Sequence, residues 1–268
     1  MRVVGSVEPV ASESEGDPNG ASREPLIETG IHRIGASIHF LRGSFFLAGG
    51  LGEGVGPEGD VIEYNLSSQR AIRRRWPLHT PRYLHAAIAL SPTRILVIGG
   101  LTSSEQGLPA TPSVERLDLE QGTSERLQDL PFATAEPQIA RLPDGRILLA
   151  GGYDDEMELR TALLDTASGT WQSPAPLPSP RAGATPLLMA GHVLLIGGLR
   201  DFGAASAPSV LIATPDLAAW TEEPLEIPFG AAIAPLEQGT FLVAGGRSPD
   251  GSPLADVTLW TVNKQHVF

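Results

Sequence analysis

Five short apolar runs in this chain each end in a pair of glycines, and this repeat constrains the fold more than any other feature. The pairs are Gly49-Gly50, Gly99-Gly100, Gly151-Gly152, Gly197-Gly198 and Gly245-Gly246. They follow one another at intervals of 50, 52, 46 and 48 residues. A nearly constant period of this length indicates a repeat architecture, in which each unit is one supersecondary motif packed on its neighbours.

Each repeat has the same plan of four extended segments. An alternating segment, such as residues 82–90, precedes the apolar run that ends in Gly-Gly, and a polar loop then leads to a third segment, such as residues 61–66. A fourth segment, often near a tryptophan, leads into a proline-rich link. Four strands in about 48 residues, with turns between them and no helical periodicity, are typical of one propeller blade. The glycine pair suits a strand that bends sharply and packs without side chains against the next blade.

These repeats resemble the kelch family of β-propellers. The resemblance is carried by the five glycine pairs, by Trp171 and Trp220, and by the links HTPRYLHAA and PSPRAGATP, which contain Arg82 and Arg181. It covers about residues 20–268, although the family's third-strand aromatic survives only as Tyr64. The resemblance implies a propeller fold. It implies no single function, because kelch propellers include enzymes, adaptors and glycan-binding proteins.

The repeat predicts one all-β domain over residues 20–268, a five-bladed kelch-type propeller of four-stranded antiparallel blades. The blades are expected at about residues 31–81, 82–131, 132–180, 181–228, and 229–268 together with 20–30. The last unit ends with little chain left for a fourth strand, whereas residues 22–35 look like the fourth strand and link of a unit. We therefore expect an N-terminal strand to complete the last blade and close the ring, which removes two exposed sheet edges. An open ring is the alternative if Met1 is a fragment boundary.

Residues 5–24 are small and acidic, contain proline and glycine, and show no periodicity, which predicts a flexible tether over residues 1–19 ahead of the propeller. Similar stretches follow the acylated cysteine of bacterial lipoproteins. Two localisations therefore stay open: the cytoplasm by default, or an extracytoplasmic lipoprotein whose signal has been removed.

Charge and composition exclude several classes of protein. Nineteen Lys and Arg against 31 Asp and Glu give a net charge of −12, which argues against a nucleic-acid or anionic-membrane partner. No apolar run approaches the roughly 20 residues of a membrane-spanning helix. The chain has no cysteine, which excludes disulfides, thiolate metal sites and the Tyr–Cys cofactor of galactose oxidase-like propellers. We expect a monomer with no cofactor.

Candidate binding residues lie in two sets of loops that propeller geometry brings to one face, around the central channel. They are Arg33, Arg82, Tyr83, Tyr153, Asp154, Arg181, Arg200 and Arg247. Arg33, Arg82 and Arg181 recur at equivalent places and are expected to surround the channel mouth, with Glu136 and Phe229 at that place in the other two units. Guanidinium groups bind carboxylate or phosphate bidentately, so such a ring favours an anionic ligand. The alternative is that these arginines pair with carboxylates of neighbouring blades and stabilise the ring.

A second candidate group consists of His32, Tyr83, His85 and Glu136, of which His85 and Glu136 are the candidate catalytic residues. Histidine titrates near neutral pH and a carboxylate orients it, so the group is suited to acid–base chemistry. It resembles the site of kelch sialic acid mutarotases, without their local signatures. The alternative is that each histidine lies at the surface or at a strand end. No metal site is expected, because the acidic loop 153–158 lacks the calcium-loop pattern.

Three functions follow from these observations. The leading one is a non-catalytic binding or interaction module that uses the loop face around the channel for a carbohydrate, an anionic small molecule or a protein partner. The second is a cofactor-independent sugar mutarotase or isomerase that uses Arg82, Arg181, His85 and Glu136. The third is a structural, lipid-anchored extracytoplasmic module.

Overall fold

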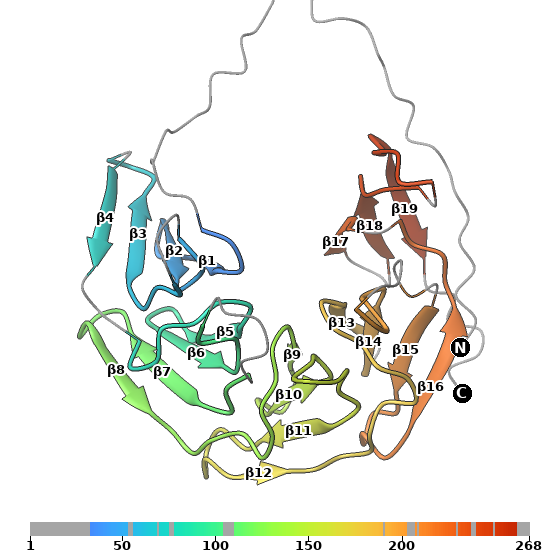
Figure 1. The fold of residues 1–268 in the computed structure, drawn as a ribbon, viewed down its shortest axis with the longest axis horizontal. Helices are drawn as coiled ribbons and strands as arrows, with labels where there is room; N and C mark the ends of the chain where they lie inside the picture. Colours follow the sequence, from blue (N-terminus) through green and yellow to red (C-terminus); the bar gives the residue numbers. More distant parts are fainter. Residues whose placement is uncertain are drawn as a thin grey trace, which may run out of the picture.

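The chain folds into five antiparallel β-sheets that follow one another around an arc (Figure 1). This computed structural model describes residues 33–52, 56–68, 70–74, 78–103, 110–189, 191–202, 207, 209–228, 230–236, 240–248 and 250–261. All regular structure in these ranges is β-strand. The prediction of an all-β, five-bladed propeller is confirmed.

Each sheet is one blade, built from strands that are consecutive in the sequence. Blade 1 contains β1 (Ser37–Leu41), β2 (Ser44–Ala48), β3 (Val61–Asn65) and β4 (Arg70–Arg74), and blade 2 contains β5 (Ala86–Ser91), β6 (Arg94–Ile98), β7 (Val114–Asp118) and β8 (Thr123–Arg126). Blade 3 contains β9 (Gln138–Arg141), β10 (Ile147–Ala150), β11 (Thr161–Leu164) and β12 (Trp171–Gln172), and blade 4 contains β13 (Thr185–Met189), β14 (His192–Ile196), β15 (Ser209–Ala213) and β16 (Trp220–Pro224). Blade 5 contains β17 (Ala232–Pro235), β18 (Thr240–Ala244) and β19 (Val257–Thr261). The first strand of each blade lies toward the middle of the arc (Figure 1).

The first three glycine pairs each join their blade to the next through the backbone. Gly99 and Gly100 both have positive φ, 68° and 98°. A Cβ on Gly99 would lie 2.4 Å from the carbonyl oxygen of Thr134, which enters the next blade. Without it, the Gly100 N–H donates to that same oxygen over 2.8 Å. The predicted reason for the repeat, a strand end that packs without side chains on its neighbour, therefore holds here.

Four apolar clusters fill the spaces between neighbouring blades. The cluster between blades 1 and 2 joins Phe46 to Val97, and the cluster between blades 4 and 5 joins Ile212 to Phe241. The other two clusters join blade 2 to blade 3 and blade 3 to blade 4 in the same way. Burying such side chains at each junction stabilises the stack by roughly 25 cal/mol per Å² of apolar surface.

Both candidate tryptophans support these junctions. Trp171 packs on the cluster between blades 2 and 3, and its indole N–H donates to the carbonyl of Gln128 over 3.2 Å. Trp220 packs on the cluster between blades 3 and 4 and donates to the carbonyl of Ala175 over 3.1 Å. Each indole thus buries its ring and still satisfies its polar atom.

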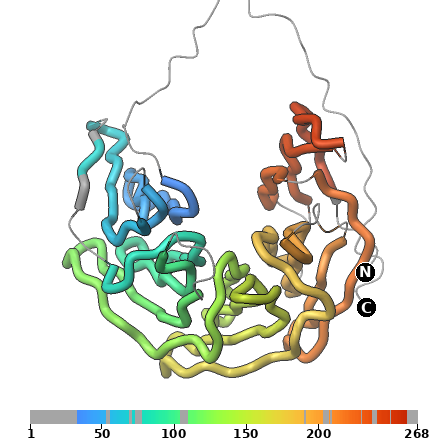
Figure 2. Tube along the Cα trace, viewed as in Figure 1, coloured from blue at the N-terminus to red at the C-terminus, as the bar shows by residue number. Residues whose placement is uncertain are grey.

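The two ends of the arc differ from these junctions. Figure 2 shows blade 1 (blue to cyan) and blade 5 (red) at opposite ends of the chain of blades. Among the described residues, most exposed large apolar side chains lie in these two blades or the link before blade 1: Ile34, Ile38, Phe40, Phe45, Leu66, Ile72, Leu236, Val257 and Leu259. The exposed face of blade 1 carries a ring pair, Phe40 and Phe45, with centroids 5.0 Å apart.

Two sequence-based expectations fall outside the described ranges. These are the tether at residues 1–19 and the strand at residues 20–30 that was expected to complete blade 5. Within the described residues blade 5 has three strands. The closing strand stays a prediction.

Candidate functional site

A chain of backbone hydrogen bonds runs from blade to blade just before the innermost strands. The N–H of Leu84 donates to the carbonyl of Gly35 over 2.8 Å, that of Glu136 to Leu84 over 2.7 Å, and that of Gly183 to Glu136 over 3.0 Å. We call these four residues the central collar. Each has a positive φ, between 48° and 65°. Each collar residue stands directly ahead of its blade's inner strand, so the collar lines the channel side.

Glu136 is the one charged member of this collar. Its φ of 48° lies in the left-handed region, where a residue with a Cβ is less stable than glycine by roughly 1–2 kcal/mol. Gly183 holds the equivalent position in the next blade without a side chain. A Cβ added to Gly183 would lie 3.6 Å from Oε2 of Glu136, so the carboxylate extends over that glycine.

The environment of the Glu136 carboxylate is poorly polar. Burial raises the pKa of this carboxyl above its ordinary value. Among the residues that the structure describes, no hydrogen bond or ion pair to its carboxylate oxygens is present, whereas its backbone carbonyl accepts from the side-chain amide of Gln138. The group is therefore a half-buried anion without a compensating cation.

An aromatic residue, Tyr153, lies next to the collar at Glu136. Tyr153 directly follows the glycine pair of blade 3 and exchanges backbone hydrogen bonds with Ala135, of 2.7 and 2.9 Å. Burial, together with the charges of Glu136 and Tyr83, raises the pKa of Tyr153 to about 12. The ring of Phe202 meets that of Tyr153 edge to face, with centroids 5.3 Å apart. Phe202 is 64% exposed. We call Tyr83, Glu136, Tyr153 and Phe202 the channel-face cluster.

Sequence reasoning found three members of this cluster and missed Phe202. The signal for Phe202 was an aromatic residue in the polar loop that follows the fourth glycine pair. Such loops reach the same face as Tyr153.

Arg82 does not reach the open channel mouth. Its side chain has no exposed surface, and its guanidinium bonds to Glu115 over 2.6 Å, with both side chains 0% exposed. It also donates to the carbonyl of Gly99 over 2.8 Å and to Ser113. The guanidinium thus connects the link between blades 1 and 2 to the glycine pair and the third strand of blade 2.

Arg181 and Arg33 are placed in the same way. Arg181 is fully buried and bonds to Glu222 over 3.0 Å, and Arg200 bonds to the same carboxylate. Burial, with the nearby charge of Arg200, lowers the pKa of Arg181 to about 10. Arg33 pairs with Asp60 over 2.9 Å. The described structure therefore does not place these guanidiniums as an open ring around the channel. They pair with carboxylates, as the alternative held, but with carboxylates of their own blades rather than of neighbouring blades.

The assumed equivalence of Glu136 with these arginines is wrong by two residues. The N–H of the second glycine of a pair donates to a backbone carbonyl in the link to the next blade. For Gly50 this carbonyl belongs to Arg82, and for Gly152 it belongs to Arg181. For Gly100 it belongs to Thr134, whose hydroxyl bonds to the Gly151 carbonyl as Arg82 does to that of Gly99. Thr134 therefore holds the arginine position. Glu136 belongs instead to the collar.

His85 and Glu136 are not brought together as an acid–base pair. The His85 ring is buried between blades 1 and 2, with Nε2 3.0 Å from the hydroxyl of Ser37. Burial, helped by the charges of Arg82 and His39, lowers the pKa of His85 to about 3. The ring is thus neutral near physiological pH. His32 lies outside the described residues.

The two remaining candidates bond to the backbone of loops, Asp154 to the loop of a neighbouring blade and Arg247 to its own loop. Asp154 accepts a hydrogen bond of 2.6 Å from the backbone N–H of Ala110 and so ties blade 3 to blade 2. Arg247 is exposed in blade 5 and donates to the carbonyl of Gly251 over 2.8 Å.

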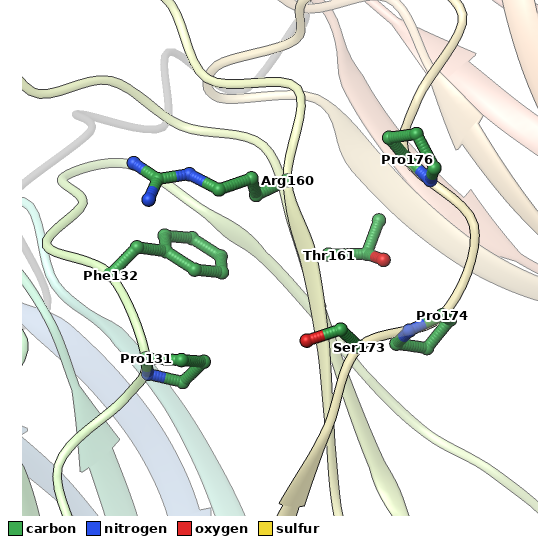
Figure 3. Close-up of a pocket in the computed structure, with 7 residues that line it drawn as sticks. All are labelled: Pro131, Phe132, Arg160, Thr161, Ser173, Pro174 and Pro176. Atoms are coloured by element: carbon green, nitrogen blue, oxygen red, sulfur yellow. The ribbon is translucent and has the colours of Figure 1, made fainter.

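A separate pocket of about 370 Å³ lies beside the link between blades 2 and 3 (Figure 3). It is lined by Pro131, Phe132, Arg160, Thr161, Ser173, Pro174 and Pro176. The Arg160 guanidinium lies over the Phe132 ring, 4.6 Å from its centroid, and pairs with Glu158. The Arg160 guanidinium therefore already has two partners within the protein, the Phe132 ring and the Glu158 carboxylate. Sequence reasoning did not identify the pocket.

The described residues offer neither a metal site nor a membrane-spanning helix. No group of three or more His, Asp or Glu side chains there is arranged to hold a metal ion. No helix long and apolar enough to span a membrane occurs in that part of the chain.

Comparisons with known proteins support the fold. No protein-family model matches the chain, and no curated protein matches it. A solved structure, described as the structure of YjhT, is similar to it with a TM-score of 0.70 and 16% sequence identity. The match covers 87% of this chain and 82% of that one. At this identity the likeness supports the propeller fold alone, and the kelch family remains an inference from the repeat residues.

Proposed function

We propose that this propeller is a non-catalytic binding module whose channel-face cluster holds a small ligand or a side chain of a protein partner. The observation that carries the proposal is Glu136 itself. A carboxylate occupies a collar position where glycine fits without strain, and it is desolvated there without a partner among the described residues. Local strain of this kind is typical of sites where the side chain serves a function.

The aromatic residues supply the rest of a binding surface. Phe202 is exposed and fixed at one edge by Tyr153. Tyrosine presents an apolar ring and a polar hydroxyl together, which suits a ligand that is partly apolar and partly hydrogen-bonding. The collar holds the backbone beside these rings through hydrogen bonds, so little ordering is needed on binding.

Binding is favoured over sugar isomerisation by the placement of the proposed catalytic groups. Arg82 and Arg181 are fully buried, and His85 has a pKa of about 3. A general base needs to reach substrate and to have a pKa near the working pH. The same burial of the arginines argues against an anionic ligand, because their charges are already paired.

A thermal-shift screen tests this proposal. The intact protein would be screened against neutral sugars, acidic sugars, phosphometabolites and organic ammonium compounds, since a ligand that binds only the folded state raises Tm. We expect one class to raise Tm in the native protein and to lose its effect in Tyr153→Ala and in Phe202→Ala. The exposed Leu188 in blade 4 gives a matched control, and Leu188→Ala should keep the shift. A shift that survives both aromatic substitutions would place binding elsewhere and overturn the proposal, as would no shift from any class.

A further inference from the structure

The negative charge of the Glu136 carboxylate has no positive counter-charge among the described residues of the site. Burial accounts for its raised pKa, and no cation among the residues that the structure describes offsets the effect. The four arginines that sequence and structure bring toward this face are each committed to a carboxylate of their own blade: Arg33 to Asp60, Arg82 to Glu115, and Arg181 and Arg200 to Glu222. The chain as a whole carries a net charge of −12.

Tyr153 is the aromatic neighbour of this carboxylate, because its backbone pairs with that of Ala135, the residue before Glu136. Tyr153 lies close enough for the Glu136 charge to raise its pKa, and Tyr83 adds to the effect. Phe202 extends the aromatic surface from Tyr153 toward solvent. Aromatic faces attract cations through their quadrupole, and the attraction grows where water is partly excluded. A carboxylate beside such faces attracts the same kind of ligand.

We infer that the channel-face cluster recognises an organic cation, a protonated amine or quaternary ammonium group carried on an apolar body. The inference rests on the proposed function and names the ligand class for that site. The ammonium group lies against the Glu136 carboxylate, and the apolar body lies along Tyr153 and Phe202. Gly183 has no side chain to occupy the space beside the carboxylate.

Two other ligand classes fit the cluster less well. A carboxylate or phosphate ligand would meet the unpaired Glu136 charge with like charge. A neutral sugar would donate hydrogen bonds to the carboxylate but leave its net charge uncompensated in a half-buried site, and a buried charge is costly unless an opposite charge pairs with it.

Three probes with one alkyl body isolate the head group: n-butylammonium, n-butanol and n-butyrate. Their dissociation constants would be measured by NMR titration of the full chain at low and at 0.5 M added salt. We expect n-butylammonium to bind at least about tenfold more tightly than n-butanol, and n-butyrate to bind most weakly. The preference for n-butylammonium should shrink in high salt, because salt screens a partly exposed charge pair.

Two substitutions at one residue, with a control, complete the test. Glu136→Gln keeps the shape of the side chain, and Glu136→Gly restores the residue that the collar accepts without strain. Both should reduce n-butylammonium affinity to that of n-butanol. Glu156→Gln removes an exposed carboxylate of the same blade and should leave the affinity unchanged.

The outcomes separate the two proposals. If n-butanol or a neutral sugar binds as tightly as n-butylammonium, and binding is lost in Tyr153→Ala but kept in Glu136→Gln, the binding module stands and the cation inference fails. If neither the probes nor any class in the screen binds through Tyr153 or Phe202, both fail.

Discussion

The guanidinium of Arg82 and the carboxylate of Glu115 form a 2.6 Å salt bridge in which neither side chain has exposed surface. Glu115 also accepts hydrogen bonds from the backbone N–H groups of His79 and Thr80 and from the Ser124 hydroxyl. These contacts hold the Glu115 pKa below its ordinary value despite the burial. The pair thus fastens the link from blade 1 to the third and fourth strands of blade 2.

Removing one partner of this pair should destabilise the propeller strongly. Arg82→Met leaves Glu115 as a buried charge without its counter-ion, so we expect a loss of about 3–5 kcal/mol in the free energy of unfolding. Urea denaturation measures it. Arg82→Met combined with Glu115→Leu should recover much of the loss, because an apolar pair leaves no charge unpaired.

The exposed pair Arg116–Glu125 on the same blade provides the control. Arg116→Met should change stability far less, because exposed ion pairs contribute little. Equal losses for Arg82→Met and Arg116→Met would show that burial of the first pair has no energetic consequence.

The partners of the buried arginines Arg82 and Arg181 could not be predicted from the sequence alone. Arg82 and its partner are 33 residues apart, and Arg181 and Glu222 are 41 apart. The residue type predicts a strong anion-binding group, but only the packed blade shows that the anion is already present within the protein. The glycine pairs were predictable because their reason is local: at Gly99 a Cβ would meet the neighbouring backbone.

Replacing Glu136 should separate backbone strain from side-chain function. Glu136→Gly removes the left-handed strain and the desolvated carboxylate, so we expect the free energy of unfolding to rise by about 1 kcal/mol. Glu136→Ala removes the carboxylate but keeps a Cβ at positive φ, and it should be less stable than Glu136→Gly by about 1 kcal/mol. Both are measured by urea denaturation.

The equivalent position in blade 4 gives the reverse experiment. Gly183→Ala introduces a Cβ at a φ of 62° and should lower stability by about 1 kcal/mol. If Glu136→Gly is no more stable than Glu136→Ala, the collar does not hold residue 136 in the left-handed region.

Acid should weaken the junction between blades 1 and 2 through His85. Its pKa is about 3 in the folded chain and near 6.5 in the unfolded one, so between these values the unfolded state binds the extra proton. Stability from this group is complete above pH 6.5 and declines as pH falls below it, by roughly 1.4 kcal/mol at pH 5.5. The nearby groups Arg82 and His39 act in the same direction on the His85 pKa.

Urea denaturation at pH 7.5, 6.5 and 5.5 tests this dependence. His85→Gln should flatten the decline, whereas His192→Gln, at the start of β14 in blade 4, should not. An unchanged slope in His85→Gln would assign the acid sensitivity to other groups.

The repeat period alone does not predict what covers the two ends of the propeller, for a physical reason. Periodicity predicts how many blades form, since each blade repeats the same backbone requirement. It does not show what covers the outer face of the first and last blades, because that depends on contacts at the ends of the array. In the structure these are the faces where Phe40, Phe45, Val257 and Leu259 are exposed.

Two truncations test the predicted closing strand at residues 20–30. Within the described residues β19 pairs with β18 along one of its two edges. A further strand would pair with the other edge of β19 and would lie near the exposed apolar faces of blades 1 and 5. Arg33 pairs with Asp60, which stands at the position of Ser113, a residue that Arg82 contacts in blade 2. The chain therefore enters blade 1 much as it enters a blade that follows another. Deletion of residues 1–30 should therefore lower Tm by about 5 °C or more and promote self-association, because it bares an edge strand and an apolar face. Deletion of residues 1–19 should change neither Tm nor the mass measured by light scattering, and equal behaviour of the two truncations would contradict closure by residues 20–30.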